Sequence, residues 1–268
     1  SVSGSGGGIL AACRADVVVR RSNILENFGN TGGGLGVLGS GCTADILPRM
    51  VVYDTAVYRN TANSNLAGAG IDQFGGGTLS VINSTIAENV NSSTSVSAVG
   101  GISVSSNTPN TATLRSSTII DNSAPNATAH EGVGLRIGSA ATATLVDNLI
   151  GFNTFNGGTA NCSGSGASTT LSSGGGNVYS TGTVTCPVNA DDSTGHGFTL
   201  VGALAFNAPG QTPTAAVSSL SAARAFGRSC ILPQDQRGVE RPLRACSSGA
   251  YQFVATPSTP EVFDNGFE

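Results

Sequence analysis

Short runs of alternating hydrophobic and polar residues recur along the first 153 residues of the chain. Each run ends on an asparagine, and these asparagines are 33, 29, 33 and 31 residues apart. They are Asn27, Asn60, Asn89, Asn122 and Asn153. A pattern that repeats with a period near 30 residues indicates a repeat architecture, in which each repeat is one unit of a stack.

Aliphatic residues occupy fixed positions before each asparagine. Ile24, Val57, Ile86, Ile119 and Ile150 come three residues earlier, Val19, Val52, Val81, Leu114 and Leu145 come eight earlier, and Val17, Met50, Leu79, Ala112 and Ala143 come ten earlier. A glycine followed by an aliphatic also repeats, as Gly34-Leu35, Gly70-Ile71, Gly101-Ile102 and Gly134-Leu135. The alternation predicts short strands with one buried face, and no segment sustains helical periodicity. Stacking such strands in parallel, about 4.8 Å apart, would place these columns inside.

We therefore predict an all-β fold. It is a single-stranded, right-handed parallel β-helix (β-solenoid) of about six rungs, with a C-terminal disulfide-containing cap and an extended tail. The asparagine column is expected at an inside bend, with its side-chain amides hydrogen bonded from rung to rung. Turn formation by asparagine alone would explain the same column.

The chain divides into three predicted parts. Residues 1–186 are assigned to the parallel β-helix, residues 187–252 to a capping region that covers the last open rung, and residues 253–268 to an extended tail. Within the capping region, residues 218–227 are the only stretch that suggests a short helix or turn. Because Ser1 falls within a rung, we expect that a leader, and earlier rungs, have been removed.

Composition excludes several classes of function. The 268 residues include twelve arginines and no lysine, and the net charge is −4. A chain without a basic excess is a poor candidate for binding nucleic acid. No apolar run approaches the roughly 18 residues that a membrane-spanning helix needs, so no such segment is expected.

The six cysteines predict three disulfides. Fifteen pairings are possible, and proximity in the sequence favours Cys13–Cys42, Cys162–Cys186 and Cys230–Cys246. Zinc is disfavoured because the chain has no C-x-x-C, and its two histidines, His130 and His196, are far apart. Disulfides in turn predict an oxidising, extracytoplasmic location.

The C-terminal quarter resembles a known family. The segments LVGALAFNAPGQTPT (200–214), DQRGVERP (235–242) and CSSGAYQ (246–252) look like the C-terminal signature of the choice-of-anchor Q domain proteins, which are bacterial surface proteins with right-handed parallel β-helix repeats. The residues in the signature positions are Gly202, Leu204, Gly210, Thr212, Pro213, Thr214, Asp235, Gln236, Arg237, Gly238, Arg241, Pro242, Cys246, Gly249, Ala250 and Tyr251. The final VFDNGFE is similar to a short motif at the end of secreted gammaproteobacterial proteins. The resemblance implies a surface location and a β-helix, and it implies no activity.

No complete catalytic constellation is found, and we assign no catalytic, cofactor-binding or metal residue. The string Asp191-Asp192-Ser193-Thr194-Gly195-His196-Gly197 contains the residue types of polygalacturonase-like hydrolases, but only three residues separate Asp192 from His196, which places both in one loop. Arg136-Ile137-Gly138 precedes this string and lacks a lysine. The remaining acids, such as Asp121, Glu131 beside His130, and Asp147, are scattered. Glu26, Arg59 and Glu88 are expected to form a surface charge ladder.

These observations favour a secreted or cell-surface structural or adhesive protein that assembles end to end into fibres, through its open N-terminal rung and its tail. Its expected partners are copies of itself and surface glycans. The alternative is a module that binds or cleaves polysaccharide, as a lyase or hydrolase.

Overall fold

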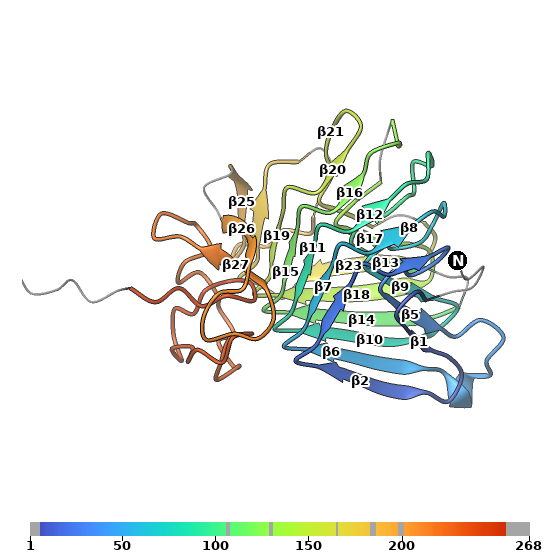
Figure 1. Ribbon diagram of the computed structural model, residues 1–268, viewed down its shortest axis with the longest axis horizontal. Coiled ribbons are helices and arrows are strands. Elements are labelled where there is room, and N and C mark those ends of the chain that lie inside the picture. The colour runs from blue at the N-terminus through green and yellow to red at the C-terminus, as the bar shows by residue number, and fades with distance from the viewer. Residues whose placement is uncertain are drawn as a thin grey trace, which may run out of the picture.

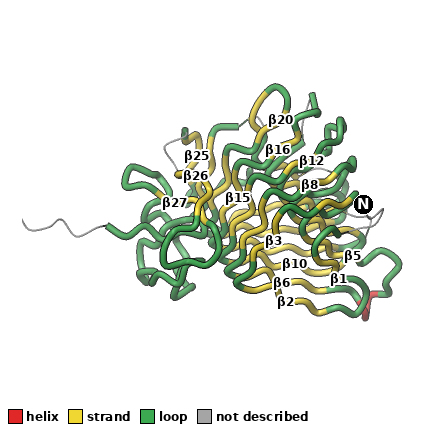
Figure 2. Tube along the Cα trace, in the orientation of Figure 1, coloured by secondary structure: helices red, strands yellow, loops and turns green. Residues whose placement is uncertain are grey.

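The chain forms a stack of short parallel strands (Figure 1). The computed structural model describes residues 6–105, 108–128, 131–164, 166–182, 186–197 and 201–255. Each of the first five turns of the stack contributes one strand to each of four sheets, and the chain between the strands forms turns and loops (Figure 2). The predicted parallel β-solenoid is therefore confirmed.

Sheets 1 and 2 have six strands each. Sheet 1 consists of β1 (Ile9–Ala11), β5 (Leu35–Leu38), β9 (Ile71–Phe74), β13 (Ile102–Ser105), β17 (Leu135–Ile137) and β22 (Cys162–Gly164). Sheet 2 consists of β2 (Asp16–Arg20), β6 (Arg49–Tyr53), β10 (Gly77–Ile82), β14 (Asn110–Arg115), β18 (Ala141–Val146) and β23 (Thr170–Ser173). Neighbours in both sheets are parallel and about one period apart in sequence.

Sheets 3 and 4 complete each turn. Sheet 3 consists of β3 (Asn23–Leu25), β7 (Ala56–Tyr58), β11 (Thr85–Ala87), β15 (Thr118–Ile120), β19 (Leu149–Gly151), β24 (Val178–Ser180) and β25 (Ser193–His196). Sheet 4 consists of β4 (Phe28–Gly29), β8 (Thr61–Ala62), β12 (Val90–Asn91), β16 (Ser123–Ala124), β20 (Thr154–Phe155) and the antiparallel β21 (Gly158–Thr159).

The aliphatic columns pair in register and fill the interior. Val81 of β10 lies between Val52 of β6 and Leu114 of β14, and all three are fully buried. Ile86 and Ile119 pair in sheet 3 and are also fully buried. Burying such side chains stabilises the fold by about 1.5–3 kcal/mol each, so these columns form the core that the alternation predicted.

The asparagine column forms a continuous ladder of side-chain amides. Asn60 donates from Nδ2 to Oδ1 of Asn89 at 2.9 Å, and Asn89 donates to Asn122 at 2.9 Å. The ladder begins at Asn27 and passes through Asn153, which donates to Asn161 at 3.2 Å. The rung-to-rung interpretation is thus confirmed, and turn formation alone does not describe this column.

All three favoured disulfides are present. Cys13–Cys42 joins the loops of the first two turns, Cys162–Cys186 closes the last turns, and Cys230–Cys246 lies in the C-terminal region. The single helix of the described chain is a 3₁₀ turn, Ala44–Ile46, in the Cys42 loop. None of the described helices is long and apolar enough to span a membrane.

The C-terminal region lies along the flank of the stack. In Figure 1 the orange and red chain lies beside β7, β11, β15 and β19. Its hairpin, β26 (Val201–Ala205) and β27 (Thr214–Val217), and Tyr251 pack on the outer face of sheet 3, against Ile120 and Leu149. Beyond the last full turn, β25 continues sheet 3. Residues 201–253, called the cover below, therefore bury the outer face of this sheet over β11, β15, β19 and β24.

Of the two alternatives expected for residues 218–227, a short helix or a turn, the structure shows turns. This stretch forms successive tight turns, in which the Ser221 amide donates to the Ser218 carbonyl and the Arg224 amide donates to the Ser221 carbonyl. The Ser221 hydroxyl accepts from the Ala223 amide, and Ala225 has a positive φ of 54°. Serine bonding to nearby backbone favours turns over helix, and this outweighs the helix propensity of the alanines.

Candidate functional site

One column of outward-facing residues on sheet 1 contains buried polar groups. The register pairs Leu10, Gly36, Asp72, Ser103, Arg136 and Ser163 across the six strands. These residues face outward because the flanking positions, such as Ile71 and Ile102, belong to the core. An acid and a base therefore lie on either side of Ser103, on the same face of the solenoid.

A pocket of about 440 Å³ lies at the N-terminal half of this face. Leu10, Leu66 and Phe74 line it and are each about two-fifths exposed. Gly36 and Asp72 also line it. The pocket therefore combines partly exposed apolar side chains and the neutral polar residues Thr31, Ser40 and Ser64 with one ionisable group, the buried carboxyl of Asp72.

Asp72 is the main polar feature of the pocket. Only 7% of the residue is exposed, and its Oδ1 accepts a hydrogen bond from the Gly68 amide at 3.2 Å. Burial raises the pKa of Asp72 to about 7, although hydrogen bonds from Gly68 and Ser103 and the charge of Arg136 oppose the rise. The single proton of the Ser103 hydroxyl is shared between this carboxyl and the Leu66 carbonyl, which lies 2.7 Å from the hydroxyl oxygen. Near neutral pH the Asp72 carboxyl is therefore divided between its neutral and charged forms.

Arg136 forms the second polar group of the column. Its Nε donates to Oε2 of Glu131 at 3.0 Å, and the same oxygen accepts from the Ser97 hydroxyl at 3.0 Å. Within the described residues, Nη1 of Arg136 and the hydroxyl of Ser105 are buried without a hydrogen-bond partner. The structure thus brings together Arg136 and Glu131, which the sequence left as separate residues. His130 lies outside the described residues.

The Asp191–Gly197 string is mainly structural in its contacts. Oδ1 of Asp192 accepts from the amide and the side chain of Asn177, at 2.9 and 3.1 Å. It thereby ends a second ladder, called the internal ladder, in which each side chain accepts the backbone amide proton of the preceding member: Thr55, Ser84, Ser117, Asn148, Asn177 and Asp192. Asp191 lies 3.6 Å from Arg228, and Nε2 of His196 lies 2.7 Å from the Ser193 hydroxyl. The Asp192 carboxylate is therefore occupied by backbone and amide donors.

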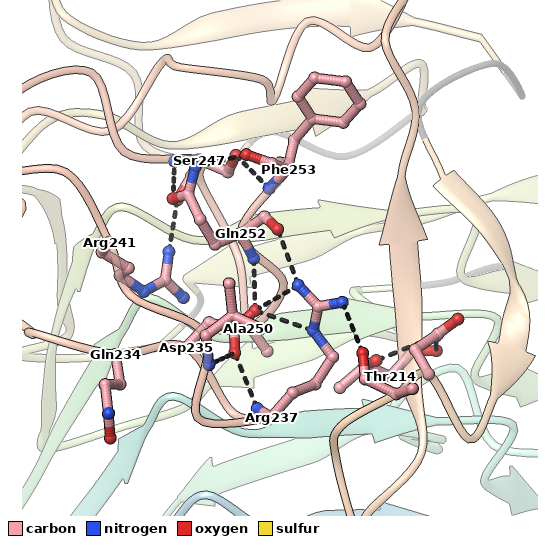
Figure 3. Close-up of polar contacts among 12 residues, drawn as sticks. Thr214, Gln234, Asp235, Arg237, Arg241, Ser247, Ala250, Gln252 and Phe253 are labelled. Carbon is pink, nitrogen blue, oxygen red and sulfur yellow. Dashed lines mark hydrogen bonds and ion pairs between the residues drawn. The ribbon is translucent and has the colours of Figure 1, made fainter. Parts of the chain in front are cut away.

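The Asp-Gln-Arg-Gly segment of the C-terminal signature forms a hydrogen-bonded clamp (Figure 3). The buried carboxylate of Asp235 accepts from Nη2 of Arg237 at 2.7 Å and from the Gln252 amide at 2.8 Å. The guanidinium of Arg237 also lies over the Tyr251 ring, 3.5 Å from its centroid. These contacts join residues 235–237 to residues 251–252 within the cover, so Asp235 and Arg237 have a structural role.

Neighbouring residues attach the clamp to the solenoid. Gln236 accepts a hydrogen bond from the Thr85 hydroxyl, and Nη2 of Arg241 donates to Oδ1 of Asn83 at 3.0 Å. Burial lowers the pKa of Arg241 to about 10, opposed by the charges of Asp235 and Asp147. The signature residues therefore position the cover on sheet 3.

The expected surface charge ladder is present in part. Nε of Arg59 donates to Oε2 of Glu88 at 2.7 Å on adjacent rungs. Both residues, like Glu26, have positive φ at the bend before the asparagine ladder. The pair contributes little to stability because it is exposed to solvent.

Asp72 was missed by the sequence analysis, although a signal for it existed. It directly follows the repeated glycine-aliphatic pair Gly70-Ile71, and strand alternation turns the next residue outward. The same position holds Gly36, Ser103 and Arg136 in the other repeats, so aligning the repeats would have grouped these residues.

Within the described residues, no group of three or more His, Cys, Asp or Glu side chains could hold a metal ion. Comparison of the chain with protein-family models, with curated proteins and with solved structures finds no match.

Proposed function

We propose that the chain is an extracytoplasmic bacterial surface protein of the choice-of-anchor Q type, with a structural or adhesive role. The observation that carries this proposal is the pairing of all six cysteines in three disulfides on a parallel β-solenoid. Disulfides persist in oxidising compartments and are rare in the cytosol. The signature residues Asp235 and Arg237 support the family assignment because they form one clamp.

We also propose that copies associate end to end. In sheet 2, β2 and β23 are the edge strands, and each pairs with one neighbour within the described chain. A strand edge of this kind offers backbone donors and acceptors to another chain. The chain is predicted to divide into residues 1–186, 187–252 and 253–268, and we propose that the last part, the tail, joins neighbouring copies of the protein. Residues 256–268 lie outside the described residues.

Fractionation of the producing cells, with an antibody against the chain, tests the location. The protein is expected in the surface or extracellular fraction with no titratable thiol, and a cytoplasmic pool with six free thiols would overturn the proposal.

Electron microscopy of the isolated protein tests the assembly. We expect threads, and deletion of residues 253–268 should leave single rods. Single rods in both samples, or threads of the deletion variant, would contradict end-to-end association through the tail.

The alternative, a polysaccharide-binding module, is favoured by one observation, the pocket at Asp72. Pockets of about 300–1,000 Å³ with apolar walls and a few polar groups are typical of small-ligand sites. Cleavage receives less support, because Asp192 serves the internal ladder.

A further inference from the structure

The pocket on the outer face of sheet 1 combines a concave apolar wall with a buried acid. The register places Gly36 directly beside Asp72. The side chain of Leu10 covers this glycine: its Cδ1 lies 2.9 Å from the position that a Cβ atom on residue 36 would occupy. Leu66 and Phe74 complete the wall. The volume of about 440 Å³ is sufficient for a single sugar ring.

Asp72 is the only ionisable residue among the described residues that line the pocket. Ser103 and Gly36, on the two flanking strands, carry no charge. The charged group that acts on Asp72 is Arg136, two strands away, and Arg136 is itself paired with Glu131 at 3.0 Å. No side chain within the pocket therefore neutralises the Asp72 carboxylate.

The buried carboxylate lacks an adjacent cation, and a ligand can supply one. An ammonium group would form a charge-assisted hydrogen bond with Asp72, and the ring that carries it would lie against Phe74 and Leu66. We propose that this pocket binds an amino sugar residue through its ammonium group, with Asp72 as the carboxylate partner and Phe74 as part of the wall against the sugar ring. The proposal stands whether or not the protein forms fibres or lies at a surface.

Binding of an ammonium group must then be linked to loss of a proton. Burial holds the pKa of Asp72 at about 7 in the free protein, so most of the carboxyl is protonated at pH 5.5 and about half is ionised at pH 7. The affinity for the ammonium form of an amino sugar should therefore rise about tenfold between pH 5.5 and 7.0. A neutral sugar gives no such rise, and an acidic sugar gives a fall.

Calorimetric titration of the full chain with three matched trisaccharides tests the proposal. The probes are the trimers of glucosamine, N-acetylglucosamine and galacturonic acid, at pH 5.5 and 7.0. We expect the glucosamine trimer to bind about tenfold more tightly than the N-acetylated one at pH 7.0, with proton release seen as a dependence of the heat on the buffer.

Two variants identify the site. Asp72→Asn keeps the shape but removes the charge, so the glucosamine trimer should bind about tenfold more weakly and without the pH dependence. Gly36→Leu fills the pocket while Asp72 stays intact; its Cβ comes too close only to Cδ1 of Leu10, which can move, and meets the Gly6 backbone at an ordinary contact distance of 3.4 Å. Asp191→Asn, at an exposed acid on another face, is the control and should bind as the unchanged protein does.

Several results would overturn the proposal. They are equal binding of the N-acetylated trimer, tighter binding of the galacturonic acid trimer, unchanged affinity in Asp72→Asn, or no binding of the glucosamine trimer at millimolar concentration.

Discussion

At each bend of the solenoid, a residue with positive φ is followed by a ladder side chain. Asp54 precedes Thr55, and Arg59 precedes Asn60, with φ values of 51° and 55°. Non-glycine residues rarely adopt this conformation. The ladder side chain satisfies the backbone at the bend, since Asn60 accepts the Asn27 amide proton and donates to the Tyr58 carbonyl. A ladder side chain must therefore both donate and accept, as the amide of Asn60 does at one bend and the hydroxyl of Thr55 does at the other.

Replacing one member of the asparagine ladder should destabilise the whole protein. Asn89→Ala leaves the Val57 carbonyl and the side chains of Asn60 and Asn122 without their partner in the interior. We expect a loss of about 2–4 kcal/mol in the free energy of unfolding, measured by urea titration. The exposed Asn156→Ala is the control and should change it by less than about 0.5 kcal/mol. Equal effects of the two changes would show that the ladder is not stabilising.

Asp72 should make the stability depend on pH. Its pKa is raised from 3.8 to about 7 in the folded chain, so the folded state binds more protons than the unfolded state between these values. The free energy of unfolding therefore falls as the pH rises from 4 to 7 and then stays low. Asp72→Asn should be more stable than the unchanged protein at pH 8, by about 1–3 kcal/mol, and the difference should disappear near pH 4. A difference that is independent of pH would contradict the burial of this carboxyl.

Elements that repeat were predictable from the sequence, whereas elements that differ between repeats were not. The inward columns of sheets 1 to 3 follow from alternation, because each buried strand face shows a period of two. The outer face of sheet 3 breaks this alternation, since Ile120 and Leu149 stand beside the inward Ile119 and Ile150. Such consecutive apolar residues indicate a strand buried on both faces, and the sequence analysis did not use this signal. The position of the cover and the pocket at Asp72 both depend on outward residues, which vary from rung to rung.

The cover should detach from sheet 3 without unfolding the solenoid when its clamp is broken. Asp235→Ala removes the acceptor of Arg237 and of the Gln252 amide. Because the chain has no lysine, trypsin cuts only after arginine, and Arg224, Arg228, Arg237 and Arg244 lie in the cover. We expect cleavage at these sites to be about tenfold faster than in the unchanged protein, while Arg115 and Arg136 of the solenoid stay protected. Mass spectrometry of the digest measures the rate at each site.

Glu240→Ala, at an exposed residue of the same region, is the control for this experiment and should digest at the rate of the unchanged protein. Cleavage at Arg115 as fast as at Arg228 in Asp235→Ala would mean that the cover and the solenoid unfold together.

Over the whole molecule, stability should be greatest in the middle of the stack. Each rung contacts mainly its two neighbours, so a central rung is held on both sides and a terminal rung on one. The disulfides Cys13–Cys42 and Cys162–Cys186 lie in the outer turns, whereas β10, β11, β14 and β15 have no disulfide within them. The disulfides therefore reinforce the turns that the stacking supports least.

Reduction of the disulfides should loosen the ends first. With a reducing agent, hydrogen exchange is expected to accelerate in the first two turns and after Cys162, while the amides of β10 and β14 keep their protection. Each lost disulfide should cost about 2–4 kcal/mol, locally rather than over the whole chain. In the double variant Cys13→Ser with Cys42→Ser, the acceleration should be confined to the first two turns, and the last turns serve as the internal control. A uniform loss of protection in this variant would show that the stack unfolds as one cooperative unit, because coupling between rungs then exceeds the stability of any single rung.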